Sequence, residues 1–242
     1  MLAASALTKV AAEVRLRDEL ILQLTHDART PVGAILTWLE VLKSQPAILP
    51  QAARAIAMAQ CSTRELTEIL SGAEDAQQVM AGTIELQMAP LDLAGLVRSV
   101  VDRVLPVAQA RSITLDCETA NPGRPAQGDE ARLRHSFTRI LAHCVGLSGP
   151  GPMQVRLLDQ GTDVRVEVLG LALTLSDSLR EALKGEGEWP SLAGPRGQGV
   201  LDFAVACRIV ALHGGRLEAE SLKNGRGTRV SATLPTPPPS AG

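Results

Sequence analysis

The chain has 242 residues, enough for two modest domains that each bury a core of their own. Basic and acidic residues are interspersed and give a formal net charge of -2, so the sequence offers no basic face for nucleic acid and no polybasic membrane anchor. Aromatic residues make up only 2% of the chain, which also excludes the stacking platforms of single-strand binders. No apolar run approaches the roughly 18 residues of a membrane span, so we expect a cytoplasmic protein without membrane contact.

The four cysteines, at positions 61, 117, 144 and 207, lack the Cys-x-x-Cys spacing of zinc and redox sites. Neither a metal centre nor a disulfide framework is predicted, and a reducing compartment fits this usage. We interpret all four as small apolar side chains.

Residues 1–80 are predicted to form a coiled-coil lead-in and a helical hairpin. Apolar residues recur at the alternating spacing of three and four that is typical of a coiled-coil seam. In the first helix they are Leu7, Val10, Val14, Ile21, Leu24, Ala28, Ile35, Trp38 and Leu42, and in the second Ile56, Ala59, Thr63, Leu66, Leu70 and Ala73. One hairpin leaves half of its apolar stripe in water, so we predict a homodimer built around a four-helix bundle.

Residues 81–235 mix helical and strand patterns. Helices are predicted over 93–110, 129–145 and 200–212, and strands over 113–117, 153–158, 164–169, 216–220 and 228–234, while 83–87 also alternates. The last four strands are expected to form two pairs, 153–158 with 164–169 and 216–220 with 228–234. The fold class is α+β, with an α/β sandwich behind the hairpin. The Pro-rich residues 236–242 are predicted to be a disordered tail.

One stretch, His26-Asp27-Ala28-Arg29-Thr30-Pro31, carries groups suited to phosphoryl chemistry. The seam around it places His26 on the outer face of the helix, with Asp27 next to it and Thr30 one turn further along. The carboxylate can fix the imidazole tautomer and take its proton, and the hydroxyl can position a water. Pro31 removes a helical hydrogen bond, so the helix can kink there. By itself, the stretch is equally typical of an exposed histidine beside a kink.

Several ordered blocks resemble the sensor histidine kinase family along almost the whole chain. Arg17-Asp18-Glu19-Leu20 and the histidine box resemble its dimerisation and phosphoacceptor domain, and residues 80–87 with 90–93 resemble the junction to its ATP-binding domain. Blocks at 128–133, 208–216 and 225–235 resemble the nucleotide helix, the last helix and the terminal hairpin of that domain. The resemblance implies a GHKL-type ATPase sandwich over 81–235.

The resemblance also assigns roles within the box. It implies that His26 is the phosphoacceptor, Asp27 its acid or base neighbour and Thr30 a support for phosphatase activity, with Arg29 and Pro31 shaping the box. The exposed face of the hairpin would dock the receiver domain of a response regulator, and an upstream histidine kinase is a further candidate partner.

The nucleotide-binding half departs from the family pattern. Arg139 and His143 stand where the family presents asparagines to Mg²⁺ and phosphate, and neither side chain offers the oxygen ligands that Mg²⁺ prefers. The strand that should end in Asp-x-Gly-x-Gly reads Val168-Leu169-Gly170-Leu171-Ala172, which removes the acceptor for the adenine amino group. Ordinary ATP binding is therefore not expected.

The last glycine-rich box keeps Gly197 and Gly199, which can cradle a phosphate, but places Asp202 or its neighbour close by. The lid before Gly197 is short and lacks phenylalanine.

Simpler interpretations stand beside these. His143 is more simply a partly buried helix histidine than a replacement ligand. Gly170, Gly197 and Gly199 are interpreted equally well as turn glycines or as nucleotide-binding glycines. His135 is interpreted as polar surface and Trp38 as core. His213 suits a helix C-terminus electrostatically and receives no chemical role.

The sequence thus predicts a two-component phosphorelay protein that passes or removes phosphoryl groups between His26 and response-regulator aspartates, with impaired ATP binding and no required cofactor. Two alternatives remain open. The first is an ATP-dependent histidine autokinase with atypical site residues, for which ATP and Mg²⁺ are cofactors. The second is a pseudokinase scaffold that dimerises and binds a regulator without chemistry.

Overall fold

The computed structural model describes residues 27–42, 49–119, 126–183, 197–222 and 227–236. They form two compact units that divide between Met80 and Ala81. Within the described part of the chain, no helix combines the length and apolar character needed to cross a membrane.

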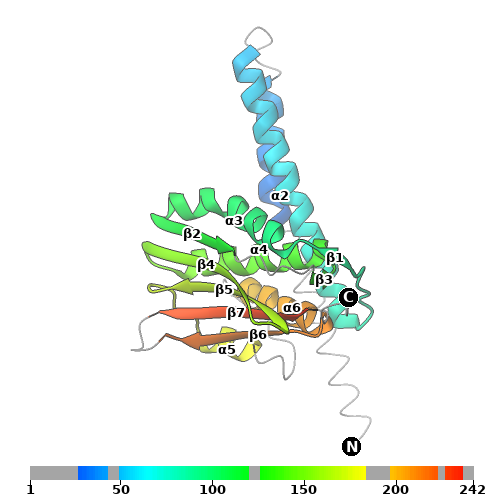
Figure 1. Cartoon of the computed structure of the whole chain (residues 1–242). Coiled ribbons are helices and arrows are strands. Elements are labelled where there is room, and N and C mark those ends of the chain that lie inside the picture. Colours follow the sequence, from blue (N-terminus) through cyan, green and yellow to red (C-terminus); the bar gives the residue numbers. More distant parts are fainter. Residues whose placement is uncertain (1–26, 43–48, 120–125, 184–196, 223–226, 237–242) are drawn as a thin grey trace, which may run out of the picture. The chain divides into compact units, whose positions relative to one another are not determined.

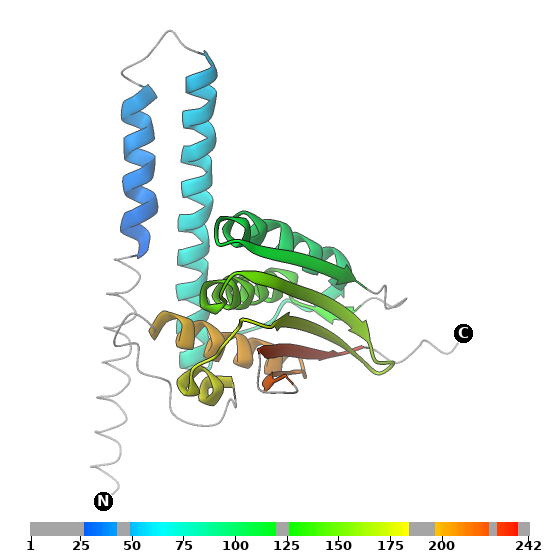
Figure 2. The ribbon, with the colours of Figure 1, turned by 90° about the vertical axis from the view of Figure 1, so that its left-hand side faces the viewer.

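The first unit contains a pair of antiparallel helices. One spans residues 27–42 and the other, α2, spans Leu49–Ala81; they run side by side in Figures 1 and 2. Seven of the buried and half-buried residues of α2 repeat at spacings of four and three. They are Ala55, Ala59, Ser62, Leu66, Ile69, Ala73 and Ala76. This is the spacing of a coiled-coil seam.

In the single chain, the predicted seam of α2 is divided between its buried and exposed sides. Three of its six positions belong to the buried and half-buried set, but Ile56 is 50% exposed and Leu70 is 49% exposed. Thr63 is exposed as well. Heptad spacing permits two neighbouring stripes, and the prediction followed the stripe with the larger apolar side chains. The buried stripe is made mainly of small residues, which carry a weak apolar signal but allow close helix packing.

The second unit is a two-layer α/β sandwich. Its five-stranded sheet has the order β2-β4-β5-β7-β6, in which β2 pairs parallel with β4 and all other neighbours pair antiparallel. The strands are β2 (Ile113–Thr119), β4 (Gly151–Asp159), β5 (Asp163–Gly170), β6 (Arg216–Ser221) and β7 (Thr228–Pro235). Figure 2 shows the helices α3 (Leu93–Ala110), α4 (Glu130–Leu147) and α6 (Gly197–Leu212) together on one side of this sheet.

The core lies between the sheet and these helices. In β5, Val164, Val166 and Val168 are buried, while Arg165 and Glu167 alternate with them on the other face. Burying a valine or leucine side chain contributes about 1.5–3 kcal/mol. Helix α3 follows the same logic, because its apolar residues recur at helical spacing and are buried on one side.

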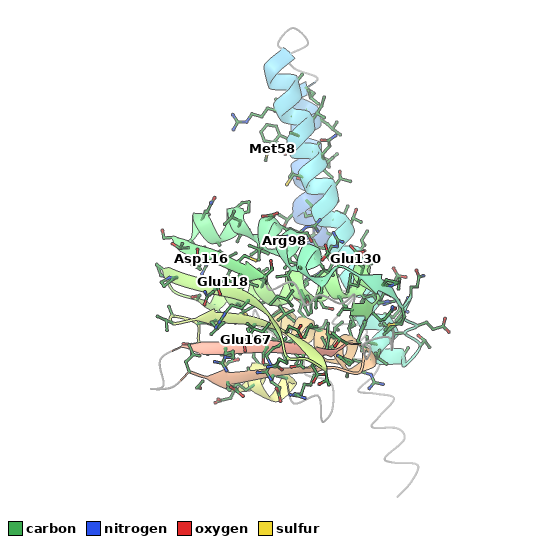
Figure 3. All side chains as sticks on the ribbon, in the orientation of Figure 1. Met58, Arg98, Asp116, Glu118, Glu130 and Glu167 are labelled. Atoms are coloured by element: carbon green, nitrogen blue, oxygen red, sulfur yellow. The ribbon has the colours of Figure 1, made fainter. Side chains whose placement is uncertain are left out.

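The open face of the sheet is polar. Asp116, Glu118 and Glu167 lie on it (Figure 3). Glu167 is only 3% exposed, and its Oε1 atom has an Arg165 and an Arg229 nitrogen each 3.8 Å away. Compensated charges of this kind allow the sheet to face water on one side without an apolar patch.

Most predicted elements of this unit are present, and three short ones were missed. The helix predicted over 93–110 coincides with α3, and β4/β5 and β6/β7 form the two predicted strand pairs. The missed elements are β1 (Ala89–Leu91), β3 (Ala126–Gly128) and α5 (Asp177–Leu183). Strands β1 and β3 pair antiparallel with one another and are too short to show a period. The alternating segment 83–87 forms no strand.

Candidate functional site

The histidine box opens the described part of the first helix. His26 itself lies outside the described residues. Asp27 is half-buried, Arg29 and Thr30 are exposed, and Pro31 is buried. The helix continues through Pro31 to residue 42, so the proline leaves it helical. The Thr30 hydroxyl is therefore open to solvent on this helix.

Arg139 and His143 come together with Asp202, which the sequence had indicated only as an added negative charge. Arg139 and His143 lie one turn apart on α4, and Asp202 lies on α6. Asp202 Oδ2 is 3.2 Å from Arg139 Nη1 and 2.5 Å from His143 Nε2. The two residues at the expected asparagine positions thus bind a carboxylate of the chain. His143 is also partly buried, as its simpler interpretation required.

His135, one turn before Arg139, was predicted to be polar surface and is half-buried. Burial, helped by the positive charges of Arg139 and Arg103 and opposed by Asp202, lowers its pKa from 6.5 to about 4. The imidazole is consequently neutral at physiological pH. His135, Arg139 and His143 lie at successive turns on one side of α4, because positions four apart share a face of a helix.

The position of the missing adenine acceptor is apolar and packed. Val168 is 7% exposed and helps to line a cavity of about 20 Å³ in the core, whose walls are formed by apolar side chains alone. Such a volume is close to that of one water molecule and does not admit a nucleotide base. Gly170 ends β5, and a Cβ atom there would lie 2.9 Å from the Leu173 Cβ atom. Gly170 therefore acts as a close-packed turn glycine.

Gly197 and Gly199 lie in the first turn of α6, which begins at Gly197. The lid segment before them, residues 184–196, lies outside the described residues. Thr228, assigned by sequence only to the terminal hairpin, is 1% exposed and donates its hydroxyl to the Leu173 carbonyl, 3.0 Å away.

His213 forms a buried junction that the sequence did not reveal. It is 5% exposed; its Nδ1 lies 2.7 Å from the Ile209 carbonyl, and its Nε2 accepts the Asp129 backbone N–H at 2.9 Å. Since Nε2 accepts, the ring is neutral and Nδ1 donates. The Asp129 side chain accepts N–H groups of Gln87 and Arg132. The histidine thus joins the end of α6 to the start of α4, whereas the prediction gave it only an electrostatic role.

No protein-family model matches the chain, but similar proteins cover most of it. The alginate biosynthesis sensor protein KinB of Pseudomonas aeruginosa is 25% identical over 94% of this chain and 38% of its own length. The sensor protein DivL of Caulobacter vibrioides is 23% identical over 93% of this chain and 29% of its own. The sensor protein GacS of Pseudomonas syringae is 22% identical over 92% of this chain and 25% of its own length. The chain therefore spans between 25% and 38% of the length of these curated relatives.

Solved histidine kinases share the fold. Full-length ShkA in complex with AMPPNP has a TM-score of 0.60 and 22% identity, covering 90% of this chain and 46% of that one. The Acinetobacter baumannii histidine kinase AdeS has a TM-score of 0.55 and 12% identity, and the match covers 87% of this chain and 98% of AdeS. The histidine kinase ThkA in complex with the response regulator TrrA has a TM-score of 0.52 and 18% identity, and the match covers 95% of this chain and 66% of the other.

The mixed sheet under α3, α4 and α6, which these structures share, defines a protein with a histidine-kinase-type ATPase sandwich. The relatives over more than nine tenths of the chain are sensor proteins, and the chain is similar to sensor histidine kinases over most of its length. This confirms the resemblance to sensor histidine kinases that was seen in the sequence.

Proposed function

We propose that this chain is a phosphorelay protein that exchanges phosphoryl groups between His26 and a response-regulator aspartate and does not depend on ATP. In the transfer, a P–N bond forms at the imidazole as the P–O bond of the aspartyl phosphate breaks and the carboxylate is released. Asp27 would hold the ring and accept its proton, and Thr30 would position water for dephosphorylation. Arg29 and Pro31 would shape the box.

The observation that carries the ATP-independent form of this proposal is the pairing of Arg139 and His143 with Asp202. Groups committed to a carboxylate are not available as Mg²⁺ ligands, and Mg²⁺ prefers oxygen donors. At the base position, Val168 offers no acceptor. A hydrogen bond to a charged group contributes about 1.5–3 kcal/mol, so its loss alone weakens nucleotide binding roughly 10- to 100-fold.

A homodimer through the hairpin is part of the proposal. On the first helix Val32 is 40%, Leu36 59% and Leu39 44% exposed, at the spacing of one helical stripe. On α2, Ile56 and Leu70 are about half exposed. Apolar stripes on both helices of one hairpin support their burial by a second copy in a four-helix bundle. Residues 1–80 would then be the dimerisation and phosphoacceptor domain, 81–235 the ATPase-like domain and 236–242 a tail.

A response-regulator receiver domain is the proposed partner. Similarity to the ThkA chain of a complex with the response regulator TrrA supports this kind of partner. The exposed Thr30 and Arg29 would lie at the docking face, and an upstream histidine kinase would phosphorylate the same regulator. We place the protein in the cytoplasm, where receiver domains are available.

One observation supports the alternative function, that of an ATP-dependent autokinase. Gly197 and Gly199 remain at the start of α6, where backbone N–H groups can hold a phosphate. A scaffold without chemistry is the other alternative, and it requires neither His26 nor a nucleotide.

The deciding experiment compares wild type with His26→Gln. Each protein is incubated with Mg²⁺ and γ-labelled ATP, and separately with a labelled phospho-regulator, and acid-labile label is measured. Label obtained only from the regulator, and only with His26, supports the phosphorelay. Label from ATP alone would establish the autokinase, and regulator binding that is identical in both proteins without any label or dephosphorylation would establish the scaffold.

A further inference from the structure

One carboxylate oxygen joins the two helices of the degenerate nucleotide site. Asp202 Oδ2 lies within hydrogen-bond distance of both His143 Nε2 and Arg139 Nη1. An ionised carboxylate only accepts hydrogen bonds, so both nitrogens donate to it. The Asp202 side chain is 10% exposed, against 20% for Arg139 and 28% for His143. The anion is thus the most protected of the three groups.

This arrangement has the geometry of a bound anion. Converging arginine and histidine donors are a common way to hold a phosphate or carboxylate oxygen. Here the oxygen belongs to α6, three residues beyond Gly199, on the helix whose glycine-rich start resembles a phosphate cradle. Helices α4 and α6 pack against each other. The chain therefore supplies from α6 the negative charge that a ligand would otherwise bring.

The charges of this cluster also act on His135, one turn before Arg139 on α4. After burial, the positive charges of Arg139 and Arg103 act to lower the pKa of His135, whereas Asp202 acts to raise it. Each of these three charges is therefore within electrostatic reach of His135. Asp202 is the negative one of the three, and its removal would take away the charge that opposes Arg139 and Arg103 there.

We infer that Asp202 is a built-in ligand: its carboxylate fills an anion site formed by Arg139 and His143 and holds α4 to α6 without nucleotide or divalent metal. The inference rests on the proposed loss of ATP binding and adds a cause for it, namely that the chain occupies the site itself. It also defines a ligand class. With the carboxylate neutralised, the two donors take a phosphate-type anion without Mg²⁺.

The test compares the full-length wild type with Asp202→Asn by thermal unfolding, with and without pyrophosphate, in EDTA and at constant ionic strength. Asp116→Asn, a carboxylate on the open sheet face, is the matched control. Removing one partner of a largely buried ion cluster lowers the Tm of Asp202→Asn by about 5–10 °C. Pyrophosphate at roughly ten times its Kd then raises the Tm of this variant by about 3 °C. Wild type and Asp116→Asn show neither change.

Two results would overturn the inference. One is a Tm of Asp202→Asn equal to that of wild type; the other is a pyrophosphate shift that is absent from Asp202→Asn or equally large in wild type. If Asp202→Asn does not fold, the triple variant Arg139→Gln, His143→Gln, Asp202→Asn replaces it. Neutral isosteres remove both the cations and their counter-ion, so the built-in ligand predicts that the triple variant folds, and failure to fold also overturns it.

The same thermal unfolding, repeated with Mg²⁺ and ATP in place of EDTA and pyrophosphate, separates this inference from the proposed function. Stabilisation of wild type by Mg²⁺ and ATP would contradict the proposed loss of ATP binding. A wild type that responds to neither ligand, together with an Asp202→Asn variant that behaves identically, would refute the built-in ligand alone.

Discussion

Replacing His135 with glutamine is expected to reduce the acid sensitivity of the ATPase-like domain. Burial, followed by the charge of Arg139, lowers the pKa of this histidine from 6.5 to about 4. In the unfolded chain the imidazole titrates near its ordinary value. Between these two pKa values the unfolded chain binds a proton that the folded chain does not, so stability falls as the pH drops from 6.5 to about 4.

The size of the effect follows from the pKa difference. Each pKa unit corresponds to about 1.4 kcal/mol, and contact of the ring with water reduces the total, so His135 costs about 2–3 kcal/mol of unfolding free energy by pH 4. Glutamine keeps the polar group but cannot take the proton. At pH 7.5 the variant should differ little from wild type in this contribution, whereas at pH 4.5 it should gain most of the calculated difference.

The assay is urea unfolding of both proteins at pH 7.5, 6.0 and 4.5, with the free energy of unfolding obtained at each pH. Carboxylates common to the two proteins cancel when the values are subtracted. A difference that does not change with pH would refute the reasoning, because it would mean that His135 titrates alike in the folded and unfolded chains.

Three further predictions concern other contacts. His213→Ala leaves the buried Asp129 N–H without its acceptor and should lower the free energy of unfolding by about 2–4 kcal/mol in urea titrations. Gly215→Ala places a Cβ atom 2.1 Å from a β7 carbonyl oxygen and should prevent or severely weaken folding, whereas Gly146→Ala, with nothing within 4 Å, should stabilise α4 by up to about 1 kcal/mol. Thr30→Ala should slow regulator dephosphorylation at least tenfold while His26 still accepts label.

Each of these has a contrary result. If His213→Ala were as stable as wild type, the histidine would not stabilise the contact between the end of α6 and the start of α4. Equal melting temperatures for the two glycine variants would contradict the close approach at Gly215. For the threonine, Thr67→Ala on the exposed side of α2 is the control; equal rates in the two alanine variants would exclude a role for the Thr30 hydroxyl.

Elements with a long, regular pattern were predictable from sequence. Helix α3 was bounded correctly because its apolar residues keep a helical period between Asp92, whose side chain accepts the Gly95 N–H, and the turn at Arg111. Strands β4 and β5 were found because apolar residues alternate with polar ones on both sides of a Gln160-Gly161 turn. In both cases the signal is local and repeats several times.

Short elements and neighbouring stripes were not predictable in the same way. Strands β1 and β3 have three residues each, and their pairing joins segments separated by α3 and β2. In α2 the sequence offered two apolar stripes one residue apart. It indicated the one with larger side chains, whereas the buried set is composed largely of alanines.

In the candidate site, too, some features were predictable from sequence and others were not. The sequence by itself identified the histidine box, the resemblance to sensor histidine kinases, and the departures at Arg139, His143 and Val168, because each is a matter of residue type at a fixed spacing. Only the tertiary structure decided that Asp202, 59 residues after His143, supplies the counter-ion to both cations. The physical reason is that hydrogen bonds and ion pairs depend on distances of about 3 Å, and packing of α4 on α6, not separation along the chain, sets those distances.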